Sequence, residues 1–213
     1  MNRFTCIDAA ALDTATAYRL MCGVVVPRPV AWITTVSNEG VVNAAPFSSY
    51  NYVAHSPPMV AVNIGSRMGA FKDTARNLRE NGFFCVNVAT EDQMEQMHAC
   101  GAEYPPEVSE PEALGIALLP GTHTPVPRIA ASPVHMECRL DQFITLGRGL
   151  NTLYIGEVMA LHLCSSVYDG HQVDSVKMRP IARLGGPYYA ALGEIFHRPA
   201  LQQAPGDPTP PAP

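Results

Sequence analysis

The residues best suited to bind an anion form two short groups in the first half of the chain. Gly65-Ser66-Arg67 ends an apolar segment, and Lys72-Asp73-Thr74 begins a segment with helical spacing. Backbone N–H groups at a helix start, together with hydroxyls and two cations, can bind a terminal phosphate. Arg67 can contact two phosphate oxygens at once, whereas Lys72 acts as a point charge. A capped helix with solvated charges would explain the same residues, so both interpretations stay open.

A second group of small and polar residues, from Asn43 to Asn51, has the composition to contact a flat ring. Small side chains let the backbone approach such a ring, whose polar edge could bond to N–H groups and hydroxyls. Pro46 cannot donate to a sheet ladder, so a strand there must bend or lie at an edge. An ordinary strand end with turn residues is the alternative interpretation.

The remaining chemistry-bearing residues form no recognisable catalytic pattern. The motifs H-E-x-x-H and G-x-S-x-G are absent, and no G-x-G-x-x-G follows the first strand. The six cysteines form no C-x-x-C pair, so we expect no zinc site. For His135 and Glu137 we favour a half-exposed polar strand face over a metal pair. We assign no catalytic residue and expect no metal, and we interpret Glu103, Glu107, Glu110 and Glu112 as parts of a solvated loop.

The composition is that of a folded protein with a sizeable core. Of the 213 residues, 47% are hydrophobic and 15% are charged. The net charge of -5 leaves no basic surplus for nucleic-acid binding. The chain has no apolar run of roughly 18 residues, so we expect no membrane span. Its first residues lack a signal-peptide pattern, so we expect a cytoplasmic protein.

The spacing of apolar and turn residues predicts mostly strands with a few helices between them. We expect strands at 23–26, 30–36, 41–48, 59–64, 83–88, 134–146 and 153–163. We expect helices at 72–81, 92–100 and 188–196, an irregular segment at 50–56 and a long surface loop at 101–131. This pattern fits a closed antiparallel barrel with helices outside it. We divide the chain into an N-terminal arm (1–17), a barrel domain (18–197) and a Pro-rich tail (198–213) that we expect to be disordered.

In their order along the chain, these segments resemble the flavin reductase-like family of FMN-binding split barrels. The likeness covers roughly residues 18 to 195. It is carried by Pro27 to Thr35, Asn43 to Ser48, Pro57 to Val60, Lys72 to Leu78, Phe83 to Val88 and Arg183 to Tyr189. The combination of these motifs favours the ligand interpretation for both groups described above.

The resemblance implies a mainly β split barrel that forms a homodimer with flavin mononucleotide (FMN) near the subunit interface. Carried over position by position, the residues facing the flavin ring would be Thr34, Pro46, Phe47, Ser48 and Ser49. The phosphate would be held by Ser66, Arg67, Lys72, Asp73 and Thr74. For Asp73 we expect the backbone N–H or a helix-capping role to matter more than the carboxylate. Tyr188 and Tyr189 would reach the flavin of the partner subunit.

The implied activity is that of an NAD(P)H:FMN reductase, in which NADH or NADPH passes a hydride to the flavin. The family also includes reductases that feed a partner monooxygenase, reductases of aromatic nitro compounds and electron carriers. A small-molecule redox substrate, or oxygenation of an organic compound on bound FMN, therefore remains an alternative. We expect the loop at 101–131 to cover the ring and to decide among these activities.

Overall fold

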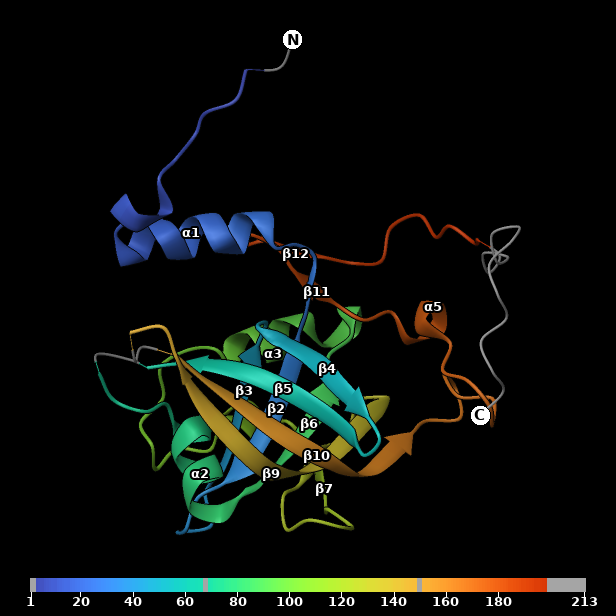
Figure 1. Cartoon of the computed structure of the whole chain (residues 1–213). Coiled ribbons are helices and arrows are strands. Elements are labelled where there is room, and N and C mark those ends of the chain that lie inside the picture. Colours follow the sequence, from blue (N-terminus) through green and yellow to red (C-terminus); the bar gives the residue numbers. More distant parts are fainter. Residues whose placement is uncertain (1–2, 67–68, 149–150, 199–213) are drawn as a thin grey trace, which may run out of the picture.

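The computed structural model describes residues 3–66, 69–148 and 151–198. Its centre is a seven-stranded sheet in the order β3-β2-β6-β9-β10-β5-β4, with every neighbouring pair antiparallel. The strands are β2 (Ala31–Val36), β3 (Val42–Phe47), β4 (Tyr50–His55), β5 (Pro58–Gly65), β6 (Phe83–Val88), β9 (Val134–Leu146) and β10 (Asn151–Leu163). Figure 1 shows the strongly twisted strands of this sheet.

The connection between β3 and β4 shows that the sheet is curled into a barrel. These strands form the two opposite edges of the sheet, yet only Ser48 and Ser49 separate them in sequence. The two edges must therefore approach each other, as in a barrel. The N–H of Asn63 on β5 donates to the carbonyl oxygen of Ser49 at 2.8 Å, which joins the crossing to the next strand. The predicted mainly β split barrel is confirmed.

Alternating side chains of the strands fill two apolar clusters. On β2, Ala31 and Ile33 belong to one cluster, and Trp32 belongs to the other, because successive side chains point to opposite faces. The first cluster includes Val62, Ile64, Leu78, Phe84, Val86, Cys138 and Tyr154. The second includes Val30, Ala44, Met97, Cys100, Ile116, Ile129 and Ile181.

Short helices and strands surround the barrel. The helices are η1 (Ala9–Ala11), α1 (Thr14–Val24), α2 (Asp73–Asn81), η2 (Glu91–Gln93), α3 (Met94–Ala99), α4 (Glu110–Ala113) and α5 (Ser175–Met178). The short strands are β1 (Arg28–Pro29), β7 (Leu118–Leu119), β8 (Arg128–Ile129), β11 (Ala182–Arg183) and β12 (Tyr189–Ala190). Helix α2 is followed by the capping residue Gly82, whose φ of 73° gives the left-handed conformation that glycine adopts without strain.

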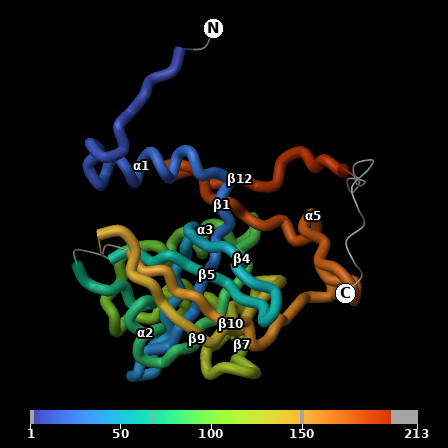
Figure 2. Tube along the Cα trace, viewed as in Figure 1, coloured from blue at the N-terminus to red at the C-terminus, as the bar shows by residue number. Residues whose placement is uncertain are grey.

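The N-terminal helix and the C-terminal segment lie together at one end of the barrel. Figures 1 and 2 show α1 beside β11 and β12, with β1 leading into the barrel. Strands β1, β11 and β12 form a small antiparallel sheet. Helix α1 has no buried residue, and 72% of Tyr18 is exposed. The predicted boundary at residue 17 falls inside this helix.

Three sequence-based predictions of local structure are wrong. Residues 23 and 24 end α1 rather than begin a strand, and residues 50–55 form β4, because pairing with β5 outweighs their irregular pattern. Residues 188–196 form no helix, because Tyr189 and Ala190 pair with β11. Within the described residues, no helix is long and apolar enough to cross a membrane.

Candidate functional site

Two adjoining cavities form one cleft beside β3. The larger has a volume of about 590 Å³ and the smaller about 70 Å³. Pro46, Gly101 and Ala102 line both cavities, which makes the cleft continuous. Lys72 and Asp73 lie in the smaller cavity, so the start of α2 forms one end of the cleft. The larger cavity forms the other end, between the barrel, α1 and the C-terminal segment.

The α2 end has the features of an anion site. Lys72 is the N-cap residue, and Asp73 is the first residue of the helix. The first N–H groups of a helix have no partner within it, so they can donate to a bound anion. The carboxylate of Asp73 lies 2.6 Å from the guanidinium of Arg76, which compensates its charge. Lys72 lies with its Nζ atom 5.8 Å from the centre of the Phe47 ring.

A buried carboxylate fixes the adjoining part of β3. Glu110 accepts hydrogen bonds from Asn43 Nδ2 at 2.7 Å and from the Ala44 N–H at 2.9 Å. Only 4% of Glu110 is exposed, and burial raises its pKa. The solvated-loop prediction is therefore wrong for this residue. The available sequence signal was Ser109, an N-cap residue before the short helix α4 that begins at Glu110.

At the opposite end of the cleft, Arg28 links two chain segments through hydrogen bonds. The Nη1 atom of Arg28 donates to the carbonyl oxygens of Cys22 at 2.7 Å and Val25 at 2.6 Å. Its Nη2 atom donates to the carbonyl oxygen of Leu184 at 3.0 Å. Arg28 thereby ties the end of α1 to the C-terminal segment, and its Nε atom lies 3.5 Å from the Ser48 hydroxyl.

Beside Arg28, the wall of the larger cavity includes the side chains of His98, Tyr189 and Arg183. His98 Nδ1 and the Tyr189 hydroxyl lie 3.0 Å apart, with the two rings edge to face. The guanidinium of Arg183 lies 4.4 Å from the centre of the Tyr189 ring. The resemblance pointed to Tyr189 only as a residue that would reach the partner subunit's flavin. Its contact with His98 could not be predicted, because 91 residues separate the two in sequence.

Comparison with known proteins identifies the family of this chain. Residues 23–177 match the family model of the flavin reductase like domain. The chain belongs to the flavin reductase-like family. The curated relative YwrF, an uncharacterized protein of Bacillus subtilis, is 39% identical over 195 residues, which is 89% of this chain and 95% of the relative.

Two solved protein structures are similar to this chain over nearly their whole length. Nitrilotriacetate monooxygenase component B from Bacillus cereus is 34% identical, with a TM-score of 0.90 over 93% of this chain and 100% of that chain. The 2-nitrobenzoate 2-nitroreductase of Pseudomonas fluorescens is 33% identical, with a TM-score of 0.82 over 96% of this chain and 99% of that chain.

In this flavin reductase-like protein, the structure brings six of the predicted site residues to the cleft. They are Pro46, Phe47, Ser48, Lys72, Asp73 and Thr74. The hydroxyl of Thr74 donates to Asn43 Oδ1 at 2.7 Å, and only 1% of the residue is exposed. Its side chain therefore supports β3, and its contribution to a ligand would come from the backbone.

Four other predicted residues do not line the two cavities. Thr34 is fully buried, and its hydroxyl donates to the Pro127 carbonyl oxygen at 2.6 Å, so the structure does not bring it to the cleft. Ser49 and Ser66 line neither cavity, and neither does Tyr188, which is 67% exposed. Arg67 lies outside the described residues.

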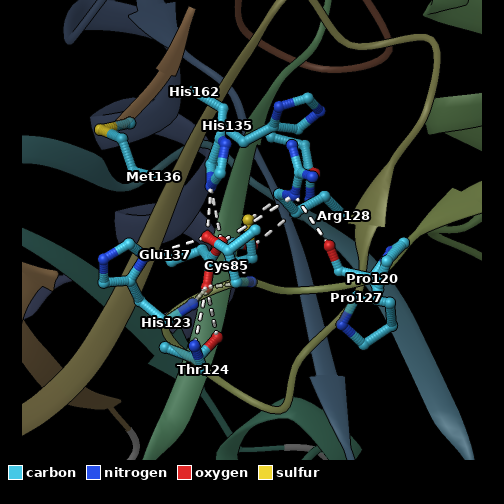
Figure 3. A network of polar contacts seen from close by, with 12 residues as sticks. Cys85, Pro120, His123, Thr124, Pro127, Arg128, His135, Met136, Glu137 and His162 are labelled. Atoms are coloured by element: carbon cyan, nitrogen blue, oxygen red, sulfur yellow. Dashed lines mark hydrogen bonds and ion pairs between the residues drawn. The ribbon is translucent and has the colours of Figure 1, made fainter. Parts of the chain in front are cut away.

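A second polar network lies away from the cleft, around Glu137 on β9 (Figure 3). Its carboxylate accepts hydrogen bonds from three successive N–H groups of residues 122–124, and from His162 Nε2 at 2.6 Å. Burial alone would raise the pKa of Glu137. The hydrogen bonds from Thr122, His123 and His162 outweigh burial and hold this pKa well below its ordinary range.

The Glu137 network corrects two predictions. The face that carries His135 and Glu137 is buried rather than half-exposed, because residues 120–129 pack over it. The loop at 101–131 is therefore divided between two places. Its first part contributes Gly101, Ala102 and Tyr104 to the cleft, whereas its second part is fastened to Glu137. Only the first part can cover a ligand in the cleft.

Proposed function

We propose that this protein is an NAD(P)H-dependent FMN reductase that holds FMN in the cleft beside β3. The observation that supports this most is the continuity of the cleft from the start of α2 to the larger cavity, within a flavin reductase-like fold. The flavin, when bound, would supply hydride acceptance and electron transfer. The protein needs to bind and orient two ligands, which explains why no acid–base pair is required.

The residues at the α2 end fit a phosphate group. Lys72 supplies a positive charge, and the first turn of α2 supplies backbone donors. Asp73 would not repel the phosphate strongly, because its carboxylate is paired with Arg76. Ser66 and Arg67 remain part of the proposed phosphate site.

The residues of β3 fit a flat ring with a polar edge. Ala45 and Pro46 present small side chains to the cleft, and Ser48 places a hydroxyl at the larger cavity. Glu110 holds this strand from behind by bonding to Asn43 and Ala44. The larger cavity lies within the roughly 300–1,000 Å³ typical of small-molecule sites, so a second ligand could be placed next to the ring.

We also propose that the protein is a homodimer. Exposed apolar side chains gather on α1 and the C-terminal segment, including Tyr18, Met21, Val24, Tyr188 and Phe196. Burying such a surface against a second copy would stabilise both segments. Light scattering after size-exclusion chromatography should give twice the chain mass, and a monomer at micromolar concentration would contradict the proposal.

The nitroreductase similarity favours a second candidate, an FMN enzyme that acts directly on an organic substrate. The similarity to a monooxygenase component instead favours a reductase that supplies a partner monooxygenase. Turnover of a nitroaromatic compound without free flavin would favour the former. An electron carrier would be reduced slowly by nicotinamides and rapidly by a protein donor.

Anaerobic mixing with NADH and NADPH tests the proposed function. The FMN-loaded protein should lose its visible flavin absorbance with at least one of the two donors. A bound flavin that stays oxidised with both would remove the reductase assignment. A protein that remains colourless with added FMN would remove the flavin assignment as well.

A further inference from the structure

The larger cavity is strongly positive although the chain is acidic. Arg19, Arg28 and Arg183 line it, and the described residues around it include no aspartate or glutamate. The whole chain carries a net charge of -5, so this concentration of cations is unlike its average surface. Clefts lined by charge of one sign concentrate ligands of the opposite sign.

None of the three cavity arginines forms an ion pair within the described residues. The Arg28 guanidinium donates to carbonyl oxygens, which satisfy its hydrogen bonds but leave its charge uncompensated. Arg183 donates to the Gly186 carbonyl oxygen at 2.7 Å, and Arg19 lies 3.4 Å from the Thr16 hydroxyl.

Three arginines elsewhere on the surface have carboxylate partners. Arg76, Arg139 and Arg179 lie 2.6, 2.9 and 2.8 Å from carboxylate oxygens of Asp73, Glu157 and Glu91. Within the described residues, the three cavity arginines therefore lack the carboxylate partners that Arg76, Arg139 and Arg179 have. A guanidinium without a carboxylate partner can bind a phosphate or carboxylate with two parallel hydrogen bonds.

Arg183 is also held in position for such a ligand. Its guanidinium stacks on the Tyr189 ring at 4.4 Å, and the Tyr189 hydroxyl is fixed by His98 at 3.0 Å. Arg19 is exposed on α1 and lines the same cavity. The cavity is therefore lined by one arginine from the N-terminal helix and one from the C-terminal segment.

We infer that the larger cavity binds an anionic group of the second reactant through Arg183 and Arg19, with Arg28 adding positive charge. This inference rests on the proposed function, which places the FMN phosphate at the other end of the cleft. The anionic group is either a phosphate of the nicotinamide dinucleotide or the carboxylate of a small aromatic acid. Both present oxygens that a guanidinium can bind in the same geometry.

Calorimetric titration of the FMN-loaded protein tests this inference. The probes are tetrahydro-NAD, which cannot donate a hydride, 2-nitrobenzoate, and uncharged nitrobenzene. The variants are Arg183→Gln, Arg19→Gln and Arg183→Lys, and Arg139→Gln is the control on β9. We expect each glutamine variant to weaken binding of at least one anionic probe about tenfold, the scale of a hydrogen bond to a charged group. Arg183→Lys should lose less, and nitrobenzene should bind equally to all proteins.

The choice of probe and the salt dependence distinguish binding of a phosphate, binding of a carboxylate and failure of the inference. Weakening confined to tetrahydro-NAD supports the inference with phosphate as the anion, and weakening confined to 2-nitrobenzoate supports it with carboxylate. Added KCl should reduce anion binding to the unchanged protein more than to Arg183→Gln. Unchanged anion affinity in both glutamine variants would overturn the inference, and so would a loss of FMN affinity without loss of riboflavin affinity.

Failure of the proposed function can be distinguished from failure of the anion-site inference. If the flavin binds but is never reduced by NADH or NADPH, the reductase proposal fails while the titrations still measure the anion site. If FMN does not bind, the same titrations are made on the flavin-free protein. Binding that depends on the arginines then supports the anion site, and binding that is independent of them overturns it.

Discussion

The Oε1 atom of Glu110 lies 2.7 Å from Nδ2 of Asn43, and this contact joins the short helix α4 to the strand that lines the cleft. The second carboxylate oxygen accepts the neighbouring N–H of Ala44 at 2.9 Å. A loop residue thereby sets the position of the strand that would face the flavin ring. The same contact explains how residues far from β3 in sequence can affect ligand binding.

Replacing Glu110 with glutamine should weaken the binding of FMN and riboflavin equally. The glutamine amide would place a donor opposite a backbone N–H, so one of the two bonds that hold β3 would be lost. We expect a loss of about 1–2 kcal/mol for each ligand. Flavin fluorescence titration measures both affinities. Glu112→Gln is the matched control, because this glutamate is exposed on the same helix. A loss for FMN alone would contradict the role given to Glu110.

Replacing Glu137 with glutamine should destabilise the protein. The substitution leaves buried N–H donors opposite an amide donor and removes the charge that faces His162. We expect the free energy of unfolding to fall by about 3 kcal/mol at neutral pH, as measured by denaturant titration. Glu157→Gln, at a partly exposed ion pair with Arg139, should change it by about 0.5 kcal/mol or less. Similar losses in both variants would contradict the account.

The contribution of Glu137 should depend on pH in a defined direction. Because folding lowers the pKa of Glu137 below its ordinary value of 4.5, its ionised form stabilises the folded state. The stability difference between the wild-type protein and Glu137→Gln should therefore be full above about pH 5 and decrease as the pH falls below 4.5. A difference that stayed constant down to pH 3 would show that the charge does not matter.

Adding a methyl group at Gly156 should disturb the barrel core. A Cβ atom there would lie 2.5 Å from the ring of Phe84, which is fully buried. Because the ring cannot move without repacking its neighbours, Gly156→Ala should reduce stability by about 1–3 kcal/mol. Gly193→Ala, with no atom within 4 Å of the added group, is the control. Equal melting temperatures for both variants would contradict this packing.

The sequence was sufficient to predict those elements whose signals are local. Runs of apolar, β-branched and aromatic residues predicted β2, β6 and β9, and Asn81-Gly82 predicted the end of α2. The family resemblance located the cleft residues from Pro46 to Ser48 and from Lys72 to Thr74. It also pointed to Thr34, whose hydroxyl the structure instead directs to the Pro127 carbonyl oxygen.

Contacts between distant segments could not be predicted in the same way. Arg28 bonds to Leu184, and Glu137 bonds to residues 122–124, only because the barrel brings these segments together. The residue type alone does not show whether a glutamate is buried or exposed. For Glu110 and Glu137, burial depends on which loop packs over the strand, and the spacing of residues does not specify that.

The affinity of Lys72→Ala for FMN and for riboflavin tests the central claim, that the start of α2 holds a flavin phosphate. We expect the substitution to weaken FMN binding by about 1.5–3 kcal/mol, the scale of a hydrogen bond to a charged group. Riboflavin, which lacks the phosphate, should bind almost as before. Arg67→Ala should behave in the same way, and Lys177→Ala, on an exposed lysine of α5, should change neither affinity. Equal losses for FMN and riboflavin in Lys72→Ala, or no loss for either, would contradict the account.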